Sequence, residues 1–137
     1  MSEEANWGIA WDFKGDVVRL YGDEIYFIHS EQRKTYVHTR NQIYRVNTNL
    51  NDAEQQMKGL PMIRTHCSFL VHMKYLERLH GDEMILKNGA SIPISEKRRK
   101  RVYDIVRSYL FASSLDRAFR VIKNTDGIVD SARCIAK

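Results

Sequence analysis

The sequence has little cysteine and lacks any long apolar run. Its two cysteines, Cys67 and Cys134, lie far apart and form no metal-like pair, so we expect free thiols, with a single disulfide as the open alternative. No stretch approaches the ~20 apolar residues that a membrane-spanning helix needs. The acidic start, Met1-Ser2-Glu3-Glu4, precedes no apolar segment. We therefore expect no signal peptide and a cytoplasmic protein.

The size and composition are those of one globular domain. The chain has 137 residues, of which 43% are hydrophobic and 28% are charged. This length fits one domain with modest extensions and leaves no room for a second full-size domain. The composition excludes a disordered or low-complexity chain.

Charge is distributed unevenly along the chain. Residues 1–31 contain two Lys/Arg against seven Asp/Glu, a net charge of −5, and the remainder contains 20 against 10, a net charge of +10. Such asymmetry suggests that the later part meets a polyanion. A merely solubilising surface is the alternative.

Alternating β-branched and aromatic residues predict a chain of short strands. Turn signals such as Gly22-Asp23 and Lys87-Asn88-Gly89 separate them, and Asn-Gly is a strong hairpin signal. We expect strands over 16–21, 24–29, 35–39, 43–46, 62–65, 82–86 and 90–94, whereas 68–79 is ambiguous between strand and helix.

Capping residues predict the helices. Asn49 precedes a short helix that runs to about Lys58, with Gly59 beyond its end. Ser95 is placed to cap a helix over 96–111, whose apolar residues recur at helical spacing. Ser113 with Asp116 forms a capping-box pattern, which predicts a separate last helix over 115–123.

The strongest single feature is the basic run of residues 97–101, Lys-Arg-Arg-Lys-Arg. Cations at the start of a helix oppose its dipole, so the sequence accepts a local cost there. Phosphates relieve this repulsion, which indicates a nucleic-acid contact. A solvated helix face, RNA, an anionic membrane surface and an acidic partner are the alternatives.

Two further polar segments are candidates for a nucleic-acid contact. Arg33 and Lys34 lie between two predicted strands, and long cationic side chains reach guanine edges or phosphates. His66, Cys67 and Ser68 follow an apolar stretch and can donate or accept hydrogen bonds. The alternatives are a structural hydrogen bond for His66 and a small buried apolar role for Cys67.

The order of these segments resembles that of LytTR DNA-binding domains. Residues 63–76, I-R-T-H-C-S-F-L-V-H-M-K-Y-L, resemble the family signature I-R-x-H-x-S-[YF]-[LI]-V-N-x-x-x-[IL]. Residues 86–95, L-K-N-G-A-S-I-P-I-S, resemble its L-x-x-G-x-x-[IL]-P-[IV]-S segment, and residues 23–28, D-E-I-Y-F-I, resemble its start. The resemblance covers about residues 16–111. It leaves 1–15 as an N-terminal arm and 112–137 as a C-terminal helical extension.

The resemblance implies a fold and a set of DNA contacts. It implies a mainly β, elongated fold of small antiparallel sheets with short flanking helices, in which loops enter successive major grooves of double-stranded DNA. By position, the base contacts fall on Arg33, Lys34, His66, Cys67, Lys97 and Arg98. The phosphate contacts fall on Ser68, Ser95, Arg99 and Lys100. It implies a bacterial transcription activator that binds promoter direct repeats, with no cofactor, no metal and no small-molecule substrate.

The chain also departs from the family pattern. Cys67 stands where many relatives carry Asn or Arg, and His72 stands where Asn is usual. No receiver domain fits beside the LytTR-like part, so the resemblance implies control by a membrane-bound inhibitor or by abundance.

Two other function classes are open on the residues alone. The tail residues Leu115, Phe119 and Ile122 suit a homodimer contact, or an interaction module that antagonises another regulator. A nuclease using His38, His66 or His72 has no catalytic motif or metal-ligand spacing to support it, so we expect no enzyme.

Overall fold

The computed structural model describes residues 8–122, with side chains described over 8–112. The chain divides into two compact units, one ending at Val102 and the other beginning at Tyr103. All strands of the described chain belong to the first unit.

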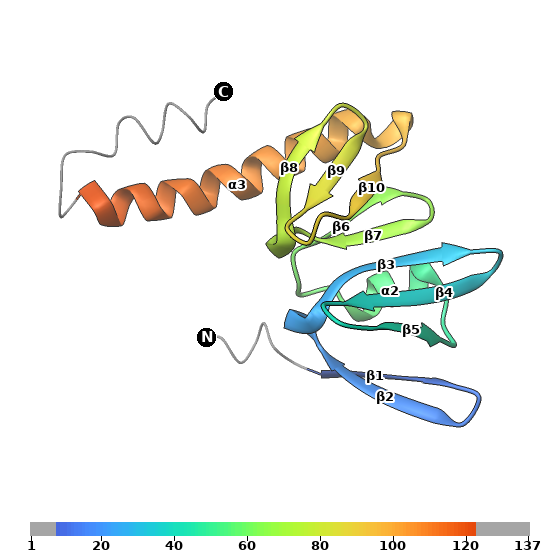
Figure 1. Cartoon of the computed structure of the whole chain (residues 1–137). Coiled ribbons are helices and arrows are strands. Elements are labelled where there is room, and N and C mark those ends of the chain that lie inside the picture. Colours follow the sequence, from blue (N-terminus) through green and yellow to red (C-terminus); the bar gives the residue numbers. More distant parts are fainter. Residues whose placement is uncertain (1–7, 123–137) are drawn as a thin grey trace. The chain divides into compact units, whose positions relative to one another are not determined.

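Within residues 8–122, ten strands form three antiparallel sheets (Figure 1). A two-stranded sheet pairs β1 with β2, a five-stranded sheet has the order β5-β4-β3-β7-β6, and a three-stranded sheet has the order β10-β9-β8. The strands are β1 (Gly8–Phe13), β2 (Asp16–Tyr21), β3 (Ile25–Glu31), β4 (Lys34–Thr39), β5 (Ile43–Val46), β6 (Met62–His66), β7 (Phe69–His72), β8 (Leu76–His80), β9 (Glu83–Leu86) and β10 (Ser91–Pro93). The mainly β class with flanking helices is confirmed.

Most expected strands form close to their predicted bounds. β2 and β5 coincide with the predicted ranges, and the hairpin of β9 and β10 turns at Gly89, whose φ of 91° suits glycine. The ambiguous segment 68–79 consists of β7, the single 3-10 turn η2 (Met73–Tyr75) and β8. The chain therefore passes from the five-stranded sheet to the three-stranded sheet within the segment whose periodicity did not distinguish strand from helix.

The expected helix after Asn49 is also confirmed. It is α2 (Leu50–Gln56), and the Asn49 side chain accepts a hydrogen bond from the Asp52 backbone N–H at 2.7 Å. This bond satisfies one of the amides that the first helical turn leaves unpaired.

Residues 8–13 form a strand that the sequence analysis did not predict. β1 pairs with β2 along its whole length, from Gly8 opposite Tyr21 to Phe13 opposite Asp16. Its alternate residues Ile9 and Trp11 are buried. This part of the expected arm is therefore part of the folded unit.

One core joins the β1–β2 hairpin, the five-stranded sheet and α2. The buried members from the strands are Ile9, Trp11, Leu20, Ile25, Ile28, Val37, Val46 and Leu70, and those from α2 and the segment after it are Leu50, Ala53, Met57 and Leu60. The Trp11 indole Nε1 donates to the Gln56 side-chain oxygen at 2.6 Å, so the indole also links β1 to α2.

A backbone hydrogen bond joins the end of the third sheet to the second sheet. Ser95 N–H donates to the Thr65 carbonyl at 2.8 Å, which fixes the chain after β10 beside β6. Met84, Leu86 and Ile92 are almost fully buried. These contacts fix the position of the segment that carries the basic run.

The basic run leads into one long helix, where two helices were expected. A 3-10 turn, η3 (Glu96–Arg98), is followed by α3 (Arg99–Ile122), which continues through Ser113 and Asp116. The predicted capping box is therefore wrong. No glycine or proline lies between residues 99 and 122 to end the helix, and serine and aspartate cost little in a helix interior. No helix among the described residues has the length and apolarity to cross a membrane.

We predict that Trp11→Ala lowers the free energy of unfolding by about 3–5 kcal/mol, because the indole is 5% exposed and leaves a cavity. Urea unfolding of the full chain measures this. The control is Val17→Ala on the partner strand, whose residue is 73% exposed and whose replacement should cost less than about 1 kcal/mol. Equal losses in the two variants would contradict the placement of β1 in the core.

Candidate nucleic-acid interface

The pairing of β3 with β7 brings two of the candidate turns together. These strands are antiparallel, with Ile28 opposite Leu70 and His29 opposite Phe69. The end of β3 therefore lies beside the start of β7, and Ser30 N–H donates to the Ser68 carbonyl at 3.0 Å. Consequently the β3–β4 turn, which carries Arg33, and the β6–β7 turn, which carries Cys67, lie at the same end of the sheet.

The β3–β4 turn is a tight hairpin in an unusual conformation. Glu31 pairs with Lys34, so only Gln32 and Arg33 lie between the strands. Their φ angles are 53° and 66°, which is the left-handed region that favours glycine and asparagine. Each such residue costs about 1 kcal/mol or more. Arg33 is exposed and Lys34 is partly exposed, so the turn presents two cations to solvent.

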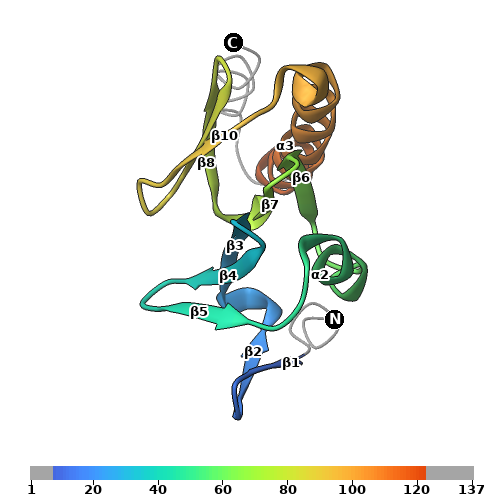
Figure 2. The same cartoon turned by 90° about the vertical axis from the view of Figure 1, so that its right-hand side faces the viewer.

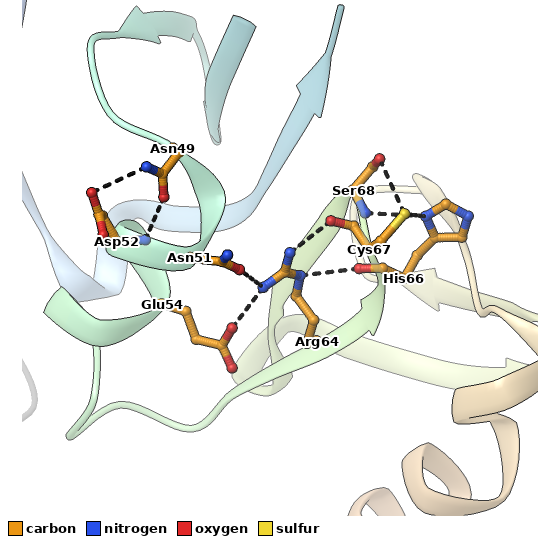
Figure 3. Close-up of polar contacts among 8 residues, drawn as sticks. All are labelled: Asn49, Asn51, Asp52, Glu54, Arg64, His66, Cys67 and Ser68. Carbon is orange, nitrogen blue, oxygen red and sulfur yellow. Dashed lines mark hydrogen bonds and ion pairs between the residues drawn. The ribbon is translucent and has the colours of Figure 1, made fainter. Parts of the chain in front are cut away.

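Arg64 holds the β6–β7 turn in place (Figure 3). Its guanidinium donates to the carbonyls of His66 at 3.1 Å and Cys67 at 2.7 Å. The same group donates to Asn51 at 3.0 Å and Glu54 at 2.7 Å, both on α2. One side chain thus links the turn to the helix by charge-assisted hydrogen bonds.

The hydrogen bonds inside the β6–β7 turn define the chemistry of His66. Ser68 N–H donates to the His66 Nδ1 at 3.1 Å, so Nδ1 acts as an acceptor. The proton of the neutral ring is then on Nε2, which is a donor suited to a base edge or a phosphate. Cys67 is exposed, and its Sγ lies 3.7 Å from the His66 Nδ1 and 3.8 Å from the Ser68 Oγ. Cys134 lies outside the described residues.

The third candidate segment runs from Ser95 into α3. Lys97, Arg99 and Lys100 are exposed and Arg98 is partly exposed. By contrast, the Ser95 Oγ and the Thr65 Oγ1 are both buried, and neither has a hydrogen-bond partner. The expected phosphate contact of Ser95 would therefore need its side chain to turn outward, whereas the cations are already presented.

All three candidate segments lie on one side of the first unit. Figure 1 shows the β3–β4 turn, the β6–β7 turn and the segment between β10 and α3 at the right-hand side of the view, one above the other. Figure 2 looks onto this side. The fold thus brings the three candidate segments together.

Three histidines outside these turns, His29, His38 and His72, have structural contacts. His72 is 2% exposed, and its Nδ1 lies 3.0 Å from the Ile25 carbonyl. Burial lowers the pKa of His72, so its ring is neutral and Nδ1 donates. The His38 Nε2 lies 2.8 Å from the His29 Nδ1, and burial, followed by the neighbouring His29, lowers the pKa of His38 to about 4. Within the described residues no group of three or more His, Cys, Asp or Glu side chains is arranged to hold a metal ion.

Comparison with known proteins gives the family. The model of the LytTr DNA-binding domain matches residues 16–107. The chain belongs to the LytTR family. A relative described as the sensory transduction protein LytT of Enterococcus faecalis is 27% identical over 78 residues, which are 53% of this chain and 32% of that protein. The chain therefore spans about a third of the length of that relative.

The fold also matches a solved structure. This is the LytTr DNA-binding domain of a Bacillus cereus protein described as a methyl-accepting/DNA response regulator. The match has a TM-score of 0.64 at 17% identity and covers 72% of this chain and 95% of the other. The match extends to the LytTR fold, not to particular DNA contacts.

The role of Arg64 was not predicted from the sequence. It lies in the quoted LytTR signature, but its partners on α2, Asn51 and Glu54, are 13 and 10 residues away in sequence. No local pattern joins these residues, because only the packing of α2 beside the sheet brings them together.

We predict that Arg64→Met lowers the free energy of unfolding by about 1–3 kcal/mol and speeds hydrogen exchange at the Ser68 amide, because the turn loses its link to α2. Urea unfolding and amide exchange of the full chain measure both. Arg78→Met is the matched control, since Arg78 is an exposed cation on β8. Equal stability and equal Ser68 protection in the two variants would show that Arg64 does not hold the turn.

Proposed function

We propose that this protein is a sequence-specific transcription regulator that binds double-stranded DNA through three turns in successive major grooves. The supporting observation is the common side of the three segments in a chain of the LytTR family. The segments come from three separate places in the sequence, and each carries exposed polar or cationic side chains.

The chemistry of the side chains suits this task. Arg33, Lys34, Lys97 and Arg98 match the acceptor pair O6 and N7 of guanine. In the β6–β7 turn, the His66 Nε2–H and the Cys67 thiol are the groups available to a base edge, with Ser68 beside them for a phosphate. Arg99 and Lys100 follow the third segment and are assigned to phosphates, which fix the register of a protein on the duplex.

The regulatory role is inferred by analogy to the relatives. One of them is described as a sensory transduction protein and another as a DNA response regulator. We extend this role to the present chain as a cytoplasmic regulator of transcription. The promoter direct repeats, the homodimer on DNA, the antagonist role and the membrane-bound inhibitor remain predictions. The tail residues invoked for the dimer lie outside the described side chains.

We predict that Lys97→Ala with Arg98→Ala weakens binding to a selected DNA site by about 1–3 kcal/mol per base contact. Sites are selected from random duplex DNA with the wild-type protein, and binding is then measured by fluorescence anisotropy at several salt concentrations. Arg40→Ala with Lys87→Ala is the matched control. Both residues are exposed. Arg40 lies in the β4–β5 turn, at the end of β4 away from the β3–β4 turn, and Lys87 lies in the β9–β10 turn, at the end of β10 away from the basic run.

The outcomes separate the site from the function. Wild-type binding that falls steeply with salt is expected, because phosphate contacts release counterions. Equal binding by the Lys97/Arg98 variant and the wild type would remove the third segment from the interface. A wild-type protein that binds no duplex DNA would contradict the proposed function.

We predict that Arg33→Gly stabilises the protein by up to about 1 kcal/mol while weakening DNA binding. Glycine adopts the left-handed conformation without strain, but it removes a cation from the β3–β4 turn. Gln32→Gly is the matched control, since it relieves the same strain and keeps Arg33. It should stabilise the protein and leave DNA affinity within about twofold, which corresponds to about 0.4 kcal/mol. A loss of DNA affinity of the same size in both variants would mean that the turn's conformation, and not Arg33, matters.

A further inference from the structure

Two cations lie against the ring of Phe13, next to the proposed interface. The Arg45 Cζ lies 4.4 Å from the ring centroid and the Lys14 Nζ lies 5.4 Å from it. Cations over an aromatic face are attracted by its quadrupole. Phe13 therefore has two cationic side chains within cation–π distance of its ring.

The β1–β2 turn that carries Lys14 resembles the β3–β4 turn in its conformation. Phe13 pairs with Asp16, so only Lys14 and Gly15 lie between the strands, with φ of 50° and 91°. Among residues 8–122, the non-glycine residues with positive φ are Lys14, Gln32 and Arg33. Both two-residue turns thus place a cation in a conformation that costs about 1 kcal/mol for such a side chain.

The hairpin is anchored beside the end of β5. Asn47 N–H donates to the Asp12 carbonyl at 2.7 Å, which joins the end of β5 to β1. Phe13, Arg33, Lys34 and Arg45 all line one open depression of about 400 Å³. Figure 1 shows the β1–β2 turn on the same side as the three candidate segments, below the β3–β4 turn. Arg33, Lys34 and Arg45 therefore share one depression with Phe13, and Lys14 lies over the ring of the same Phe13.

Three carboxylates lie near these cations. Asp52 lines the same depression, where its carboxylate keeps its charge and accepts a hydrogen bond from the Asn49 amide at 3.1 Å. Asp12 and Asp16 are exposed neighbours of Phe13 in the hairpin. Within residues 8–112 no carboxylate forms an ion pair with Lys14 or Arg45. An anion from outside the chain is thus the partner that this pair of cations suits.

We propose that Lys14 and Arg45 bind the phosphate backbone of the duplex beside the groove entered by the β3–β4 turn. This inference rests on the proposed DNA binding and extends the interface to Lys14, which precedes the family match at 16–107, and to Arg45 within it. The cation–π contacts order both side chains before the phosphate arrives, which reduces the entropic cost of binding. A phosphate contact carries no sequence preference, so its contribution is the same on every duplex.

The test uses the full chain with Lys14→Asn and Arg45→Gln combined. Asparagine tolerates the left-handed conformation, so the turn is kept while its charge is removed. Binding is measured by anisotropy on a selected site and on a random-sequence duplex of equal length, from low to moderate salt. Urea unfolding checks that the variant is folded, and Arg40→Gln with Lys87→Gln removes two exposed charges as the control.

The expected result is a similar loss of affinity on both duplexes, about 5- to 50-fold near 0.1 M salt, with a salt slope reduced by about 1–2. An affinity and slope equal to those of the Arg40/Lys87 control would overturn the inference. If the Lys14/Arg45 variant equals this control while the Lys97/Arg98 variant loses affinity, the proposed function stands without the Lys14 and Arg45 contact. A wild-type protein that binds neither duplex would instead contradict the proposed function itself.

Discussion

The pairing of β3 with β7 is the contact on which the candidate interface depends. These strands are about forty residues apart in sequence, and the β4–β5 hairpin and α2 lie between them. Antiparallel pairing forces the end of one strand to lie beside the start of the other. The β3–β4 and β6–β7 turns therefore lie at the same end of the sheet, and this placement does not depend on the sequences of the turns. The backbone bond from Ser95 to Thr65 then adds the third segment beside β6.

The register of this pairing also decides which side chains enter the core. Ile28 and Leu70 are opposite one another and are fully buried in the core that α2 covers. Their neighbours His29 and Phe69 point to the other face and stack with ring centroids 5.5 Å apart. A slip by one residue would exchange the two faces and bury an imidazole in place of an isoleucine. The apolar pattern of β3 and β7 therefore fixes the position of the turns as well as the core.

Much of this fold was predictable from local signals, and the LytTR motifs located the three segments. Turn residues and alternation gave most strands, and Asn49 gave the start of α2. β1 has only a weak strand signal, because Ile9 and Trp11 alternate with Gly8, Ala10 and a single polar residue, Asp12, in an acidic N-terminal segment. The capping pattern at Ser113 does not end α3, because no helix-breaking residue accompanies it. The bridge from Arg64 to Asn51 and Glu54, and the grouping of Arg45 with Lys14, depend on tertiary packing, which a local pattern does not encode.

The places where the sequence departs from local preference coincide with the proposed interface. Lys14 and Arg33 occupy positions in tight turns where glycine or asparagine would cost less. The run 97–101 places cations at a helix start, where the dipole and their mutual repulsion oppose them. Each departure reduces stability in the isolated protein, and a polyanion would relieve the charge repulsion in the run 97–101. Departures at separate points of the chain that gather on one side of one unit indicate a binding surface, because unrelated local defects would be scattered over the fold.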